Sequence, residues 1–129
     1  MNLELRENKK YSIKRFISGF KNSKAGLSYA YKNEQSMTIH LISCIIVLVL
    51  GTLYHISLME WMLCIMVLGL IAATELINTS IEAIVDLVTQ EFHPFAKIAK
   101  DTASAAVFVF SVVAFLSFVI IFIPKMLGL

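Results

Sequence analysis

The sequence is poor in the residues that build disulfide-bonded or zinc-bound folds. It contains 2 cysteines among 129 residues, and both Cys44 and Cys64 fall inside apolar runs without a C-x-x-C or Cys/His ligand spacing. This pattern excludes a disulfide framework and a structural zinc site. The chain also lacks a G-x-x-x-x-G-K-S/T loop and the glycine-rich loop and H-R-D set of protein kinases. The common nucleotide-binding folds are therefore excluded.

Charge is scarce as well. Charged residues make up 16% of the chain and the net charge is +2, too small a surplus to indicate a nucleic-acid partner. The sequence has no internal repeat, low-complexity tract or long linker, so we expect residues 1–129 to form a single domain. The first apolar run follows about thirty polar and basic residues, a beginning unlike that of a signal peptide.

What the chain has in abundance is apolar sequence. Hydrophobic residues account for 58% of it, against about 45–50% in soluble domains. Three apolar runs, 37–54, 58–88 and 102–123, are each long enough to cross a hydrocarbon core of about 30 Å. These runs predict an all-α integral membrane protein with three transmembrane helices. Because the second run is longer than a span requires, we expect its polar second half to emerge at the membrane surface.

Residues 1–33 have a different pattern. From Tyr11 to Tyr31, apolar residues recur at helical spacing among basic ones. This spacing predicts an N-terminal amphipathic helix on the cytoplasmic membrane surface. Gly19 and Gly26 lie within it and are points where the helix could break.

The distribution of basic residues predicts the orientation. Most of them precede the first span: Arg6, Lys9, Lys10, Lys14, Arg15, Lys21, Lys24 and Lys32. Lys97 and Lys100 lie between the second and third spans, and only Lys125 follows the third. By the positive-inside rule, the N-terminus and the loop at 90–101 are cytoplasmic and the C-terminus is outside. We therefore expect a multi-pass protein of the cell membrane.

The most informative feature is a polar stripe in the second apolar run. Spacings of three and four residues place its members on one helix face: Glu75, Asn78, Glu82 and Asp86. Carboxylates at membrane depth cost several kcal/mol unless they face protein, metal or water. The stripe therefore indicates a functional site, and the competing interpretation is a salt-bridged packing face.

Other polar residues gather on the same predicted side of the membrane. Glu34, just before the first span, could complete a Mg²⁺ site with Glu82, because Mg²⁺ takes few protein carboxylates and keeps waters and phosphate oxygens. Pro94 is suited to the first turn of a helix that continues through Lys100 into the third span. The sequence leaves open whether Lys100 binds phosphates, snorkels, or pairs with Asp101 or Asp86. We interpret His40 as a satisfied polar residue inside the first span.

Two long strings resemble the signature of the prokaryotic diacylglycerol kinase family. They are E-L-I-N-T-S-I-E-A-I-V-D at 75–86 and H-P-F-A-K-I-A-K-D-T-A-S-A-A-V at 93–107. The N-E pair at 33–34, the E-W pair at 60–61 and the terminal I-I-F-I-P-K extend the similarity over about residues 15–125. Within the family, the loop and the ending resemble the Gram-positive branch, whose members are undecaprenol kinases. The resemblance implies a homotrimer of three-span protomers with active sites shared between neighbouring subunits.

The resemblance also implies roles for individual residues. It implies a general base at Glu75 with the Asn78 amide beside it, and Mg²⁺ ligands at Glu34 and Glu82. The residues that it assigns to ATP, either on the phosphates or around the nucleotide, are Arg15, Asp86, Glu91, His93, Lys100 and Asp101. Arg15 matches an arginine that contacts nucleotide or lipid.

Three functions remain open at this point. The first is an ATP-dependent lipid kinase that converts undecaprenol to undecaprenyl phosphate, and the second is the same chemistry on diacylglycerol. Asn22 and Lys24 stand where diacylglycerol kinases carry Tyr and Trp, which disfavours diacylglycerol. The third is a non-enzymatic assembly subunit or a proton relay. A relay would need acids across the whole bilayer, whereas these acids occupy one half of the span.

Overall fold

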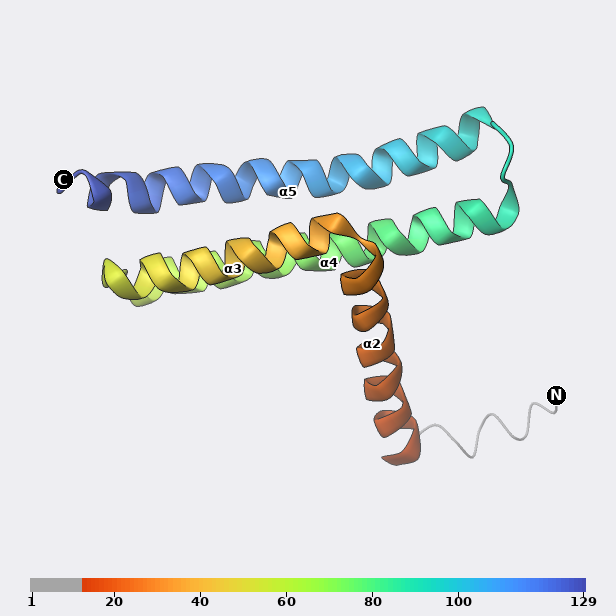
Figure 1. The fold of residues 1–129 in the computed structure, drawn as a ribbon, viewed down its shortest axis with the longest axis horizontal. Helices are drawn as coiled ribbons and strands as arrows, with labels where there is room; N and C mark the ends of the chain where they lie inside the picture. The colour runs from red at the N-terminus through yellow and green to blue at the C-terminus, as the bar shows by residue number, and fades with distance from the viewer. Residues whose placement is uncertain (1–12) are drawn as a thin grey trace. The chain divides into compact units, whose positions relative to one another are not determined.

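The computed structural model describes residues 13–129, which form four helices (Figure 1). They are α2 (Ile13–Asn33), α3 (Gln35–Leu53), α4 (Leu58–Val88) and α5 (Pro94–Met126). The prediction of an all-α protein is confirmed. The chain divides after Asn33 into two compact units, so α2 and the unit of α3, α4 and α5 are described separately. Arg6, Lys9 and Lys10, which contributed to the predicted orientation, lie outside the described residues.

The N-terminal unit is one continuous helix. α2 runs through both Gly19 and Gly26 without a break. A glycine in a helix interior costs about 1 kcal/mol relative to alanine, which the remaining residues of a helix of this length offset. Large apolar side chains on α2 are exposed, among them Phe16 and Phe20. The position of α2 on a membrane surface stays a prediction.

The second unit contains three helices that are long and apolar enough to cross a membrane: α3, α4 and α5. The number of candidate spans therefore agrees with the sequence analysis. α5 begins well before the predicted third span, with Pro94 in its first turn as the sequence predicts. The backbone N–H of Phe95 donates to Nδ1 of His93, the residue that caps the helix (3.3 Å). The segment 90–101, which the sequence analysis placed between the second and third spans as a loop, is thus partly helical.

The three long helices alternate in direction. α5 lies alongside α4, and α3 runs antiparallel to the first part of α4 (Figure 1). α3 has 19 residues and α4 has 31, so α4 extends well past the beginning of α3. With the same rise per residue in both helices, the first turn of α3 lies level with Glu75. The remaining polar part of α4 therefore extends beyond the beginning of α3, where α5 is its neighbour.

The opposite end of this unit is held by a compact cluster of contacts. Ser57 and Glu60 form a capping box at the start of α4, and Glu60 also pairs with Lys125 of α5 (3.3 Å). The apolar core lies beside them and is built on Ile56, Cys64, Ile121 and Phe122. These contacts hold the start of α4 against the end of α5. The polar stripe lies at the other end of α4.

Replacing Gly51 with Ala is expected to destabilise the protein by about 1–3 kcal/mol, the usual cost of overpacking. A Cβ at this position would lie 2.6 Å from ring atoms of Trp61, so the indole would have to move. Gly69→Ala is the matched control, because a Cβ at Gly69 meets nothing within 4 Å. Denaturant or thermal unfolding in detergent measures the difference. Equal stability of the two variants would contradict the close α3–α4 contact.

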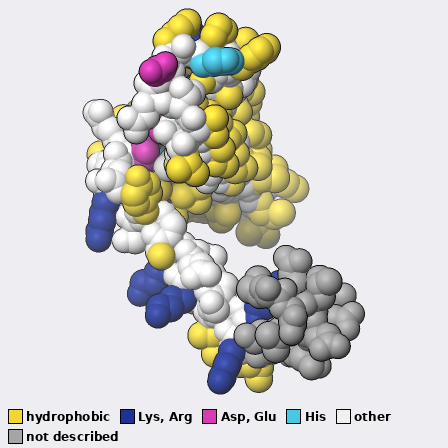
Figure 2. All heavy atoms as spheres, turned by 90° about the vertical axis from the view of Figure 1, so that its right-hand side faces the viewer, with side chains coloured by type: hydrophobic (Ala, Val, Ile, Leu, Met, Phe, Trp, Pro, Cys, Tyr) yellow, Lys and Arg dark blue, Asp and Glu magenta, His cyan; other side chains and the backbone are white. Residues whose placement is uncertain are grey.

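Most apolar side chains of the second unit point outward. Large residues such as Ile45, Phe108 and Phe115 are exposed, and Figure 2 shows hydrophobic side chains over much of the visible surface of this unit. Such a surface is incompatible with water and suits contact with lipid tails or with further copies of the chain.

Candidate functional site

The site is built first on one face of α4. Asn78 donates from Nδ2 to Oε1 of Glu82, four residues later (3.0 Å). This contact fixes the orientation of the amide, so that its Oδ1 atom is shielded from solvent. Among the described residues, Asn78 Oδ1 is the enclosed side-chain nitrogen or oxygen atom that has no hydrogen-bond partner. An enclosed acceptor without a partner is costly, and it indicates a place where a ligand or water donates a hydrogen bond.

Glu75 lies one turn before Asn78 and is the most enclosed acid of the stripe. Its residue surface is 8% exposed. The start of α3 supplies its surroundings, because Ser36 lines the same cavity as Glu75 and the Glu34 carboxylate is close enough to repel it. Glu82 repels it from the same helix. The short link between α2 and α3 thus brings Glu34 to the acidic stripe.

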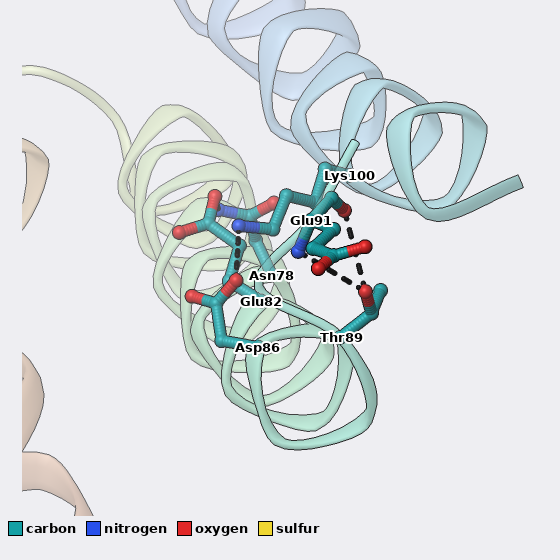
Figure 3. A network of polar contacts seen from close by, with 6 residues as sticks. All are labelled: Asn78, Glu82, Asp86, Thr89, Glu91 and Lys100. Atoms are coloured by element: carbon teal, nitrogen blue, oxygen red, sulfur yellow. Dashed lines mark hydrogen bonds and ion pairs between the residues drawn. The ribbon is translucent and has the colours of Figure 1, made fainter. Parts of the chain in front are cut away.

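Lys100 extends across from α5 to α4. Its Nζ atom donates to Oδ1 of Asp86 (2.6 Å), and both side chains remain partly exposed. Figure 3 shows the ammonium group of Lys100 lying over the α4 face that carries Asn78, Glu82 and Asp86. The structure therefore brings a cation to the exposed end of an otherwise acidic cluster. A partly exposed pair of this kind contributes little to stability and leaves Lys100 able to bind another anion.

The connector between α4 and α5 forms a tight turn. The Thr89 hydroxyl accepts from the backbone N–H of Glu91 (3.2 Å) and donates to its carbonyl (3.3 Å). These bonds fix the backbone of Glu91, as Figure 3 shows, while the Glu91 side chain stays exposed. His93 uses Nδ1 to cap α5. A capping role thus accounts for one of its two ring nitrogens.

Among the described residues, no side-chain contact with the stripe is formed by Glu91, His93 or Asp101. Asp101 forms an exposed ion pair with Lys97 on its own helix. Arg15 lies on α2, in the unit whose position relative to the stripe is not described. Sequence reasoning missed Ser36 and Thr89. Ser36 could have been found from its position two residues after Glu34. The turn formed by Thr89 has no distinct sequence signal.

A largely apolar cavity of about 530 Å³ lies beside Glu75. All three long helices line it, with Ser36 and His40 from α3, Glu75 and Val67 from α4, and Phe118 from α5 among the lining residues. One end of the cavity thus carries a carboxyl group, and the rest is mostly hydrocarbon. This combination fits a molecule with one polar group on a long apolar chain.

Oxygen donors dominate the polar end. Glu34 and Glu82 offer carboxylate oxygens, hard ligands of the kind that Mg²⁺ accepts. No group of three or more His, Cys, Asp or Glu side chains in residues 13–129 is arranged to hold a metal ion alone. The donor set therefore suits a cation whose remaining ligands come from water and phosphate.

Comparison with known proteins identifies the family. The family model described as prokaryotic diacylglycerol kinase matches residues 21–122. The undecaprenol kinase of Bacillus subtilis is 37% identical over 114 residues, which cover 88% of this chain and 93% of that protein. A diacylglycerol kinase of Helicobacter pylori strain 26695 is 40% identical over 94 residues, covering 73% of each chain. The diacylglycerol kinase of Escherichia coli K12 is 29% identical over 107 residues, covering 83% of this chain and 88% of that protein. The chain therefore belongs to the prokaryotic diacylglycerol kinase family, a family of lipid kinases.

Proposed function

We propose that this protein phosphorylates undecaprenol with ATP at the cytoplasmic face of the cell membrane, yielding undecaprenyl phosphate and ADP. The observation that carries the choice of lipid is the match to the Bacillus subtilis undecaprenol kinase, which extends over nearly the full length of both chains. The apolar cavity beside Glu75 supports a substrate with one hydroxyl group and a long hydrocarbon chain.

Glu75 is the proposed general base. Its carboxylate takes the proton of the lipid hydroxyl as the hydroxyl oxygen bonds to the γ-phosphorus of ATP. The bond between the γ-phosphorus and the bridging oxygen then breaks, and ADP leaves with that oxygen. The unpaired Oδ1 of Asn78, one turn away, is placed to accept a hydrogen bond from substrate or water.

The phosphates are proposed to bind at the other end of the stripe. Lys100 supplies positive charge there, beside Asp86. Glu34 and Glu82 would hold Mg²⁺, which offsets phosphate charge when it is bound. Further nucleotide contacts are proposed for Glu91, His93 and Asp101, and for Arg15 of α2.

The proposed assembly is a homotrimer with shared sites. In a protomer of three long helices, much of the apolar surface is exposed. The polar stripe is also open along one side, at Glu82 and Asp86. Polar groups at membrane depth need cover from protein or water, which a neighbouring copy can supply. The proposed topology places the N-terminus and the α4–α5 connector in the cytoplasm.

Phosphorylation assays on the purified protein test the function. Transfer of the γ-phosphoryl group of radiolabelled ATP is measured with undecaprenol and with dioleoylglycerol in mixed micelles. A kcat/KM that is higher for undecaprenol supports the proposal, and a higher value for dioleoylglycerol replaces it by the diacylglycerol alternative. No transfer to either lipid would leave the non-enzymatic assembly or proton-relay interpretations.

Glu34→Gln and Glu82→Gln are each expected to raise the Mg²⁺ concentration required for half-maximal activity. Each substitution removes one of the two carboxylates proposed to bind the cation and keeps the size of the side chain. Titration of activity with Mg²⁺ at saturating ATP measures the shift. An unchanged Mg²⁺ dependence in both variants would rule out the shared metal site.

A further inference from the structure

Asn78 uses its side chain differently from the polar residues next to it on α4. Its Nδ2 atom donates to Oε1 of Glu82 (3.0 Å), whereas the hydroxyl groups of Thr79 and Ser80 donate to backbone carbonyls of their own helix. The amide therefore acts on another side chain. Because Glu82 is one of the two carboxylates proposed to hold Mg²⁺, the contact bears on the cation.

The orientation of the Asn78 amide leaves its other end without a partner. Oδ1 is enclosed and accepts no hydrogen bond within residues 13–129. An enclosed acceptor without a partner costs more free energy than a polar pair one turn apart on a helix contributes. Exchanging the two ends of the amide would place Oδ1 against an oxygen of Glu82, and neither atom carries a hydrogen. Glu82 thus sets the orientation of the amide, and helix stability alone does not explain the contact.

The contact makes the two oxygen atoms of Glu82 unequal. Oε1 accepts the amide hydrogen, whereas Oε2 has no hydrogen bond or ion pair with the described residues. Lys100, which extends from α5 to this face of α4, is bonded to Asp86 instead. The Glu82 side chain is half-buried. It therefore offers one free oxygen, while the amide of Asn78 holds the other.

Mg²⁺ and Ca²⁺ differ in the way they use a carboxylate. Mg²⁺ demands near-octahedral geometry at about 2.0–2.1 Å and keeps several waters, whereas Ca²⁺ takes more oxygen ligands at about 2.3–2.6 Å and accepts both oxygens of one carboxylate. A cation that bound both oxygens of Glu82 would compete with the amide hydrogen for Oε1. The contact with Asn78 thus favours binding through one oxygen, which suits the smaller ion.

We propose that Asn78 selects Mg²⁺ over Ca²⁺ by positioning Glu82: its amide holds Oε1 and leaves Oε2 as the single oxygen for the cation. Asn78 acts through Glu82 and is a positioning residue. The other coordination positions are left to water and phosphate oxygens, in keeping with the small donor set of residues 13–129. The inference rests on the cation site of the proposed function and adds which ion that site prefers and why.

Competition binding tests the proposal without measuring catalysis. The purified protein in detergent is titrated with Mn²⁺, a paramagnetic ion that carboxylate and water ligands also suit, and the free ion is measured by electron paramagnetic resonance. Mg²⁺ and Ca²⁺ are then added separately, and the ratio of their displacement constants gives the selectivity. The unaltered protein is expected to release Mn²⁺ at a lower concentration of Mg²⁺ than of Ca²⁺. Glu82→Gln is expected to weaken Mn²⁺ binding, which locates the ion.

Asn78→Leu removes the amide and keeps a side chain of similar size. It is expected to lower the selectivity for Mg²⁺ over Ca²⁺ about tenfold, the lower end of the range for losing a group that holds a metal ligand. The affinity for Ca²⁺ should stay within about threefold, because Glu82 is then free to bind through both oxygens. Asn78→Asp also loses the donor but adds a charge that attracts both ions, so the ratio is the quantity expected to fall. If Asn78→Leu does not assemble, the ratio in Asn78→Asp decides.

Ser80→Ala is the matched control. Ser80 is exposed two residues after Asn78, and its hydroxyl donates to the carbonyl of Leu76 (2.9 Å), so the selectivity should not change. An unchanged ratio in the Asn78 variants would overturn the proposal even if their thermal stability falls, since a purely structural role lowers both affinities equally. Mn²⁺ binding that is absent from the unaltered protein, or unaffected by Glu82→Gln, would overturn it too. Absence of lipid phosphorylation would instead refute the proposed function, which these binding measurements do not use.

Discussion

Replacing Glu75 with Gln is expected to lower the kcat for lipid phosphorylation by about a hundredfold or more, as the loss of a general base does. The amide keeps the size of the side chain but does not accept the proton of the lipid hydroxyl. The affinity for ATP should be largely preserved, because Glu75 lies at the cavity end of the stripe, whereas Lys100 lies over Asp86 at the other end. Single-turnover phosphoryl transfer and equilibrium binding of ATP measure the two effects separately.

Glu60→Gln provides the matched control for this prediction. It is the same substitution at the other end of α4, where Glu60 caps the helix and pairs with Lys125. We expect it to lower the thermal stability and to leave kcat unchanged, since it does not touch the proposed site. A kcat close to that of the unaltered protein in Glu75→Gln would show that another group is the base. A fall in kcat of equal size in both variants would indicate a general loss of structure.

The stripe on α4 was predictable because its geometry is local. Residues three and four apart share a helix face whatever the rest of the chain does, and the contact between Asn78 and Glu82 follows that spacing. The start of α5 was predictable for a similar reason, since proline in a first helical turn needs no information from other helices. Sequence reasoning therefore succeeded where the spacing of residues along one helix determined the result.

The partners of Lys100 could not be predicted in the same way. The sequence left Asp86 and Asp101 as alternatives, and the structure pairs Lys100 with Asp86 and Lys97 with Asp101. Adjacent residues on a helix point in different directions, which disfavours the pair of Lys100 and Asp101. The contact with Asp86, however, depends on how α5 lies against α4. That arrangement comes from packing along both helices rather than from any motif.

His40 shows the same limit more clearly. As a single polar residue in an apolar run, it was interpreted as a satisfied core histidine. In the structure it is buried and lines the cavity that α3, α4 and α5 share beside Glu75. Sequence gives the depth of such a residue in its helix but not the space that it faces. The contact of Arg15 with the nucleotide and the proposed trimer likewise depend on how separate units are placed, which the spacing of residues along one helix does not encode.

Lys100→Ala is expected to lower kcat/KM for ATP by about tenfold to a hundredfold, the range for a lost hydrogen bond to a charged group. Lys100 reaches across to the acidic face of α4 and lies partly exposed, so its ammonium group can exchange Asp86 for a phosphate oxygen. Without it, the negative charge of the phosphates meets an acidic cluster with one cation fewer. Initial rates over a range of ATP concentrations, at saturating lipid and Mg²⁺, measure the change.

Lys97→Ala separates this role from a general effect of charge. It removes the same charge from the same helix three residues earlier, where the side chain makes an exposed pair with Asp101. Exposed pairs contribute little to stability, so we expect a change in kcat/KM for ATP well below that of Lys100→Ala. If Lys100→Ala lowers thermal stability but leaves the kinetics with ATP intact, Lys100 serves only to hold α5 against α4. Its position over the stripe then reflects helix packing, and the phosphates must be bound by other residues.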